Sequence, residues 1–198
     1  TNGKCLATLQ HSAAVTASAF SPNGTLVVTG SRAGAVIVWD VSSSRRLATL
    51  LGHTHDVYSV AFAPDGNRIV TGSADYTAKV WDVPSAKLLA SLEGHTAAVN
   101  SAFFSPDGSR IVTAGDDMTI RVWGGTLRKR TASLDGHKDW VTTAAFSPDG
   151  QRIVTASRDH TAKVWDAASG RPIASLAGHK DWVYSATYSL DGRRILTA

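Results

Sequence analysis

A sequence period of 42 residues is the strongest constraint on the fold of this chain. Histidines recur at that spacing, at His11, His53, His95, His137 and His179. Tryptophans recur at the same spacing, at Trp39, Trp81, Trp123 and Trp165. Repetition at such a period indicates one small unit that buries its apolar surface by stacking against copies of itself.

Each unit contains four short β-branched segments separated by turns. In the second copy these segments are VYSVAF (57–62), RIVTGS (68–73), TAKVWD (77–82) and KLLASL (87–92). The first two are joined by APDG, in which Pro presets φ and Gly supplies a positive φ, as a tight hairpin requires. Segments of this length and composition predict strands and exclude helices. Four-stranded units at this period indicate blades arranged radially about an axis.

The recurring motifs carry a family resemblance. "GH" stands about thirty residues before "WD", with SPDG and S-x-D-x-T between them, and this pattern resembles the WD40 family of β-propellers. The four strands of a blade in this family are lettered a to d, with d outermost. The resemblance implies that a sequence repeat runs d-a-b-c, whereas a structural blade runs a-b-c-d. The expected fold is therefore all-β, a β-propeller of four-stranded antiparallel blades with about 4.7 repeats of 42 residues.

We expect residues 1–198 to form a single domain that is a partial, open propeller. The expected parts are an orphan d strand at 4–9, blades at about 14–51, 56–93, 98–135 and 140–177, and an incomplete blade of strands a and b at 182–198. Further blades from a parent chain, or self-association, would complete such a propeller.

The resemblance also implies a hydrogen-bonded tetrad in each blade. It links the GH histidine, a Ser or Thr of strand b, the Asp of the b–c turn and the Trp of strand c. The complete sets are predicted to be His53, Ser73, Asp75 and Trp81, and His137, Ser157, Asp159 and Trp165. Two sets are predicted to be degraded: His11, Ser31 and Trp39, with Ala33 in place of Asp, and His95, Asp117 and Trp123, with Gly115 in place of Ser.

The same residues raise the alternative of a hydrolase, because Ser157, Asp159 and His160 lie within four positions. A catalytic site needs one exposed nucleophile with a base in reach. Here the constellation is repeated beside a strand Trp, and no G-x-S-x-G elbow occurs. We therefore interpret these groups as structural and predict no catalytic, cofactor-binding or metal-ligating residues. His55 and His160 are interpreted as surface loop residues.

The d–a and b–c loops vary between repeats, whereas the a–b turns are nearly constant. Variable loops on a constant frame are typical of a recognition surface, and the resemblance points to the same face. The candidate partner-binding residues there are Arg32, Asp56, Tyr58, Tyr76, Asn100, Asp116, Trp140, Arg158, His160, Trp182 and Tyr184. Packing between blades is the alternative for Trp140 and Trp182.

Composition limits the partners. The net charge is +4, but the basic groups Arg45–Arg46, Arg128–Lys129–Arg130 and Arg193–Arg194 do not alternate with aromatics as a nucleic-acid track would. A single cysteine and the absence of a long apolar run favour the cytoplasm and no membrane. We expect a non-catalytic scaffold that binds a protein or peptide. A sensor module of a larger signalling protein and an engineered or recently amplified repeat array remain alternatives.

Overall fold

The computed structural model describes residues 5, 7–124 and 129–198. The strands of the first sheet are β1 (Val15–Phe20), β2 (Leu26–Ser31), β3 (Val36–Asp40) and β4 (Arg46–Leu50), with a 3-10 turn η1 (Arg32–Gly34). The second sheet contains β5 (Val57–Phe62), β6 (Arg68–Ser73), β7 (Ala78–Asp82) and β8 (Lys87–Leu92). The third contains β9 (Val99–Phe104), β10 (Ile111–Gly115), β11 (Ile120–Gly124) and β12 (Lys129–Leu134). The fourth contains β13 (Val141–Phe146), β14 (Arg152–Ser157), β15 (Ala162–Asp166) and β16 (Pro172–Leu176), and the last β17 (Ala186–Tyr188) and β18 (Ile195–Thr197).

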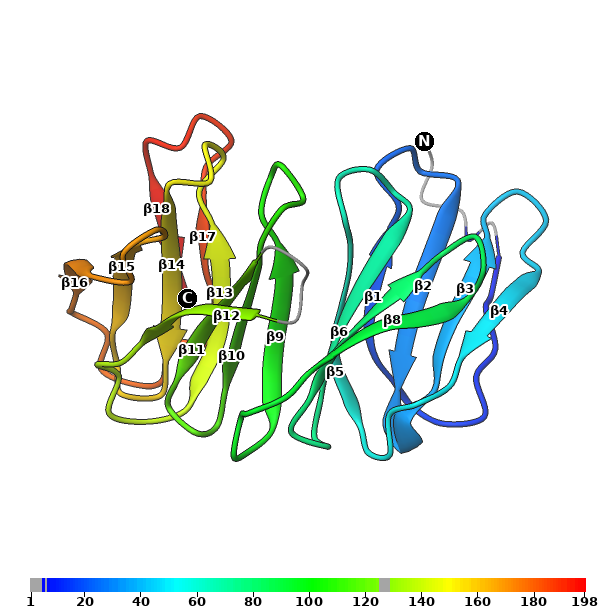
Figure 1. The fold of residues 1–198 in the computed structure, drawn as a ribbon, viewed down its shortest axis with the longest axis horizontal. Coiled ribbons are helices and arrows are strands. Elements are labelled where there is room, and N and C mark those ends of the chain that lie inside the picture. Colours follow the sequence, from blue (N-terminus) through cyan, green and yellow to red (C-terminus); the bar gives the residue numbers. More distant parts are fainter. Residues whose placement is uncertain (1–4, 6, 125–128) are drawn as a thin grey trace.

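Each sheet is an antiparallel meander in chain order, which makes it one propeller blade. The first strands of successive blades (β1, β5, β9, β13 and β17) contact one another and are called the inner strands. Figure 1 shows the blades following one another in chain order, from blue to red, with the first and last at opposite sides. The fold is therefore an open, all-β propeller.

The expected blade boundaries each enclose one observed four-stranded sheet, and the region 182–198 holds two short strands. The orphan d strand expected at 4–9 is not observed in the part of the chain that the structure describes. Residues 4 and 6 lie outside the described residues, and residues 5 and 7–9 adopt no strand.

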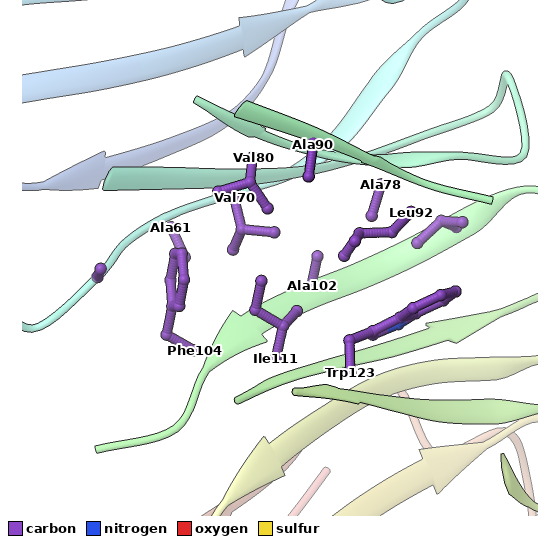
Figure 2. Close-up of a cluster of buried hydrophobic side chains, with 12 residues drawn as sticks. Ala61, Val70, Ala78, Val80, Ala90, Leu92, Ala102, Phe104, Ile111 and Trp123 are labelled. Carbon is purple, nitrogen blue, oxygen red and sulfur yellow. The ribbon is translucent and has the colours of Figure 1, made fainter. Parts of the chain in front are cut away.

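Apolar side chains from facing blades form the core. Figure 2 shows one such cluster, in which Val70, Val80 and Leu92 of the second blade face Ile111 and Trp123 of the third. Equivalent clusters fill the other junctions between neighbouring blades. The strand-c tryptophans Trp81, Trp123 and Trp165 thus pack against the preceding blade, which explains why a tryptophan recurs at this position.

A bulge near the start of the inner strands brings polar side chains to the next blade. In β13, for example, the pairing register shifts between Val141 and Thr143, which leaves Thr142 unpaired. The Thr142 hydroxyl donates to the backbone carbonyl of Val183 in the next blade, at 2.8 Å. Asn100, at the same repeat position, donates to the Val141 carbonyl at 3.1 Å. These bonds tie the inner strands together at the end that carries the d–a and b–c loops, called here the loop face.

Arginines tie the blades at the opposite end. The Arg68 guanidinium donates to the Gly108 carbonyl at 3.1 Å and lies 5.2 Å from the centre of the Phe104 ring. Arg110 makes the same pair of contacts with Gly150 and Phe146. Because the a–b turns are nearly constant, the contacts repeat from one junction to the next. No helix within the described residues is long and apolar enough to cross a membrane.

Candidate functional site

A buried polar network occupies the second blade, and its hydroxyl comes from Thr71. His53 Nδ1 lies 2.7 Å from Asp75 Oδ2, and His53 Nε2 lies 2.6 Å from Thr71 Oγ1. The indole N–H of Trp81 donates to the same hydroxyl oxygen at 3.0 Å. In the fourth blade Thr155 joins His137 at 2.8 Å and Trp165 at 2.9 Å, and His137 lies 2.7 Å from Asp159.

The prediction that Ser73 and Ser157 supply the hydroxyl is therefore wrong. Thr71 and Ser73 share one face of β6 because strand side chains alternate between faces. Ser73 ends the strand, however, and its hydroxyl donates to the His55 carbonyl at 3.2 Å and accepts from the Asp75 N–H at 3.1 Å. The serine closes the loops around the histidine, while the threonine reaches the ring.

The third set is complete, which corrects the prediction that Gly115 degrades it. His95 lies 2.9 Å from Asp117 and 2.8 Å from Thr113, and Trp123 donates to Thr113 at 2.9 Å. Gly115 replaces only the loop-closing serine. A β-carbon at this glycine would approach the Ala98 carbonyl oxygen to 2.6 Å, so the neighbouring backbone occupies the space that a side chain would need.

The first set lacks its carboxylate. His11 lies 2.6 Å from Thr29, and Trp39 donates to Thr29 at 2.7 Å. Ser31 donates instead to the Ala35 carbonyl at 3.1 Å. With Ala33 at the aspartate position, His11 Nδ1 is buried without a hydrogen-bond partner. Such an orphan is costly to stability, because the group loses its hydration without replacement.

The pKa values of the network groups follow from burial and hydrogen bonding. Burial lowers the pKa of His53 and His137, and the nearby aspartates only partly oppose this effect. Burial alone would raise the pKa of Asp159, but hydrogen bonds from Thr161, the Lys138 N–H and His137 outweigh it and bring the pKa to about 2. The His53–Asp75 and His137–Asp159 pairs are thus held as a neutral imidazole beside an ionised carboxylate at neutral pH.

These contacts do not make a nucleophile–base pair. The Ser157 side chain is buried, and its hydroxyl donates to the Asp139 carbonyl at 3.0 Å. Both ring nitrogens of His137 are engaged, with Asp159 and Thr155. His160 is exposed on the b–c turn. The geometry therefore gives no support to the hydrolase alternative.

A cleft of about 280 Å³ opens on the loop face. It is lined by Tyr58, Asn100, Asp116, Trp140, Thr142, Arg158 and Tyr184. Six of these seven were candidates from the sequence. Thr142 was missed, although it shares its repeat position with Tyr58, Asn100 and Tyr184, and that shared position was the available signal. The bulged start of the inner strands brings this position from successive blades to one place.

Arg158 lies between two tryptophans at the edge of this cleft. Its guanidinium carbon is 4.1 Å from the centre of the Trp140 ring and 4.3 Å from that of Trp182. Trp182 in turn meets Tyr184 edge to face, with ring centres 6.1 Å apart. We call Trp140, Arg158 and Trp182 the indole–guanidinium stack. It joins the fourth blade to the fifth.

The two indoles of the stack are surface groups. Trp140 is 39% exposed and Trp182 is 42% exposed, whereas the strand-c Trp165 is 1% exposed. Both indoles are therefore partly exposed while contacting Arg158 between the fourth and fifth blades, unlike Trp165, which lies in the core.

Other candidates lie outside the cleft. Arg32 and Asp56 pair with each other at 3.8 Å, with Arg32 largely exposed. Tyr76 and His160 are exposed at left-handed positions of their b–c turns, with φ of 69° and 67°. Among the described residues, no group of three or more His, Cys, Asp or Glu side chains is arranged to hold a metal ion.

Comparison with known proteins connects this geometry with a repeat family. The family model described as "WD domain, G-beta repeat" matches the chain five times, at residues 3–40, 44–82, 86–124, 128–166 and 170–198. A search of curated proteins gives no match.

Proposed function

The chain belongs to the WD40-repeat family, whose propellers typically serve protein–protein interaction, and on this premise we propose that its loop face binds a protein or peptide segment in the cleft beside the indole–guanidinium stack. The observation that carries the proposal is the stack itself. Two half-exposed indoles hold a guanidinium at the edge of a cleft, and Trp, Tyr and Arg are the side chains most enriched at binding hot spots.

The size of the cleft suits a peptide side chain. Its volume of about 280 Å³ lies just below the range of about 300–1,000 Å³ that small-molecule sites occupy. Tyr58 and Tyr184 present partly exposed rings on its walls. Such rings offer apolar area with a polar edge at low cost in side-chain entropy, which suits a segment of extended chain.

The polar groups of the cleft are held in place by the fold. Asn100 donates to Asp116 at 2.6 Å and to the Val141 carbonyl at 3.1 Å. Thr142 donates to the Ala156 carbonyl at 3.1 Å and to the Val183 carbonyl at 2.8 Å. A surface whose side chains are already fixed loses little conformational entropy on binding.

The proposal is tested by selecting peptides from a random display library on the immobilised chain and measuring their affinity for variants. Trp182→Ala and Tyr184→Ala should weaken the selected peptides by about tenfold or more while leaving the unfolding midpoint nearly unchanged. Leu190→Ala is the matched control, because Leu190 is fully exposed on an a–b turn at the opposite end. Selected peptides that bind the first two variants and the control equally well would show that the loop face is not the binding surface.

A further inference from the structure

The guanidinium of Arg158 has no acceptor within the described part of the protein. Its Nε is buried without a hydrogen-bond partner. No ion pair joins it to a carboxylate of the described residues, although Asp116 lines the same cleft. Arginine carries five N–H donors and cannot be deprotonated in a protein. A partly buried arginine in this condition calls for an explanation, since buried donors are nearly always paired.

The carboxylates next to the stack residues in sequence are bonded to other groups, and Asp159, which follows Arg158, lies 2.7 Å from His137. Asp139 Oδ1 accepts from the Trp140 N–H at 2.7 Å, and Asp181 Oδ1 accepts from the Trp182 N–H at 2.7 Å. Each aspartate thereby orders the backbone of the tryptophan that follows it. Asp116 Oδ1 accepts from Asn100 at 2.6 Å. The Oδ1 atoms of Asp139, Asp181 and Asp116 thus accept hydrogen bonds from donors other than Arg158.

From these observations we propose that the cleft selects partner segments that carry an acidic side chain, the carboxylate of Asp or Glu, bound by Arg158. This inference rests on the proposed function of the loop face and names the chemistry that the face recognises. The guanidinium carbon lies 4.1 and 4.3 Å from the centres of the two indole rings, so an acceptor must approach it between the indoles. A carboxylate that meets a guanidinium in its plane receives two parallel N–H bonds.

The charges around the cleft favour a carboxylate over a phosphate. Arg158 is the cation among the lining residues, and Asp116 is a negative charge on the same wall. Arg158 and Asp116 already balance each other, so a bound carboxylate gives the cleft one net negative charge. A phosphate carries close to two negative charges at neutral pH, so Asp116 would repel it more strongly.

The test uses three pools of short random peptides that share a fixed central residue: Glu, Gln or phosphoserine. The immobilised chain should retain the Glu pool in preference to the Gln pool, and individual Glu peptides should lose about ten- to hundredfold in affinity when Glu is replaced by Gln. Arg158→Gln should abolish that difference. Arg32→Gln is the matched control, because Arg32 lies outside the cleft and its guanidinium is exposed. The unfolding midpoint of each variant is measured alongside.

Equal retention of the Glu and Gln pools would overturn the proposal while leaving the proposed function intact. Retention of none of the pools would contradict both. Preferred retention of the phosphoserine pool would assign the site to phosphorylated segments instead. Should Arg158→Gln lower the unfolding midpoint, Arg158→Lys, which keeps the positive charge, must retain a preference for Glu over Gln that is smaller than that of the unchanged chain, because lysine lacks the paired N–H geometry.

Discussion

Thr71 and Trp81 are joined by a hydrogen bond of 3.0 Å from the indole N–H to the threonine hydroxyl. The same hydroxyl lies 2.6 Å from His53, so one small side chain on strand b links two aromatic rings. Thr29, Thr113 and Thr155 take the same place in their blades. The threonine, and not the serine two residues later, is therefore the repeating centre of the network.

Replacement of this threonine should weaken the fold. We expect Thr71→Val, which keeps the shape and removes the hydroxyl, to lower the free energy of unfolding by about 1–3 kcal/mol, because the His53 and Trp81 nitrogens lose a buried partner. The measurement is urea denaturation followed by tryptophan fluorescence. Thr54→Val is the control, since Thr54 is exposed and should change the stability little. Equal stability of the two variants would contradict the role given to Thr71.

Completing the first network should stabilise the first blade. The triple change Ala33→Asp, Gly34→His and Ala35→Thr gives this b–c turn the sequence of the fourth repeat, in which Thr161 and Lys138 hold Asp159 in place. We expect a gain of about 1–2 kcal/mol, because the buried His11 Nδ1 obtains a carboxylate partner.

The single change Ala33→Asp should give less than the triple change. In the present turn Ala33 and Gly34 are both left-handed, with φ of 72° and 81°, whereas in the fourth repeat only His160 of the turn is left-handed. A β-carbon at Gly34 would also clash with the His53 carbonyl oxygen in the present backbone. The turn must therefore change its backbone before a carboxylate at position 33 can reach the histidine. A triple variant that unfolds at lower urea than the unchanged chain would refute the idea.

Stability should fall as the pH drops below neutrality. Burial lowers the pKa of His137 below 6.5 in the folded state, so the unfolded chain takes up its proton first as the pH falls. The free energy of unfolding should therefore decrease from about pH 6.5 downward. His137→Gln should flatten this decrease, whereas His160→Gln, at an exposed position, should leave it unchanged. An unaltered slope in His137→Gln would contradict the assignment.

The Asp159 carboxylate, the partner of His137, affects stability at lower pH. The pKa of Asp159 is depressed from 3.8 to about 2, so its contribution is present above pH 3.8 and is lost as the pH falls toward 2. Asp159→Ala should cost about 1–3 kcal/mol at neutral pH and progressively less below about pH 4. Denaturation curves of this variant and of the unchanged chain across that range measure whether their free energies of unfolding converge. A constant difference down to acid pH would count against the ionised pair.

The two kinds of tryptophan should respond differently to truncation. Trp165→Ala should cost about 3–5 kcal/mol, because it empties a site in the core between blades. Trp140→Ala should cost only about 1 kcal/mol, the scale of a surface cation–π contact. Calorimetry of both variants measures the two losses in the free energy of unfolding. A loss for Trp140→Ala as large as that for Trp165→Ala would show that the stack is part of the core.

The uncovered faces of the first and last blades should promote self-association of this chain. Phe20 is 67% exposed, although Phe104 at the same repeat position packs in the junction between the second and third blades. Leu196 is 69% exposed, although Val154 at its position is buried. We expect a mass above that of one chain in light scattering, and lower association for Phe20→Glu and Leu196→Glu. A single-chain mass at all concentrations would contradict this expectation.

Much of this protein could be predicted from the printed sequence alone. The 42-residue period, the turn residues and the β-branched segments are local features, and together they indicate four strands per repeat. The variable loops also supplied six of the seven residues that line the cleft. Tyr58, Asn100 and Tyr184 are among them, whereas Thr142, at the same repeat position, was not.

Tertiary structure alone decided which polar groups meet. Thr71 and Ser73 lie on the same face of one strand, so their spacing does not distinguish them, and only the distance to the histidine ring does. The stack likewise depends on how the loops of two blades approach each other, because Arg158 and Trp182 come from different repeats. Strand periodicity is a property of the local backbone, whereas a contact between blades depends on their mutual orientation, which the packed core sets.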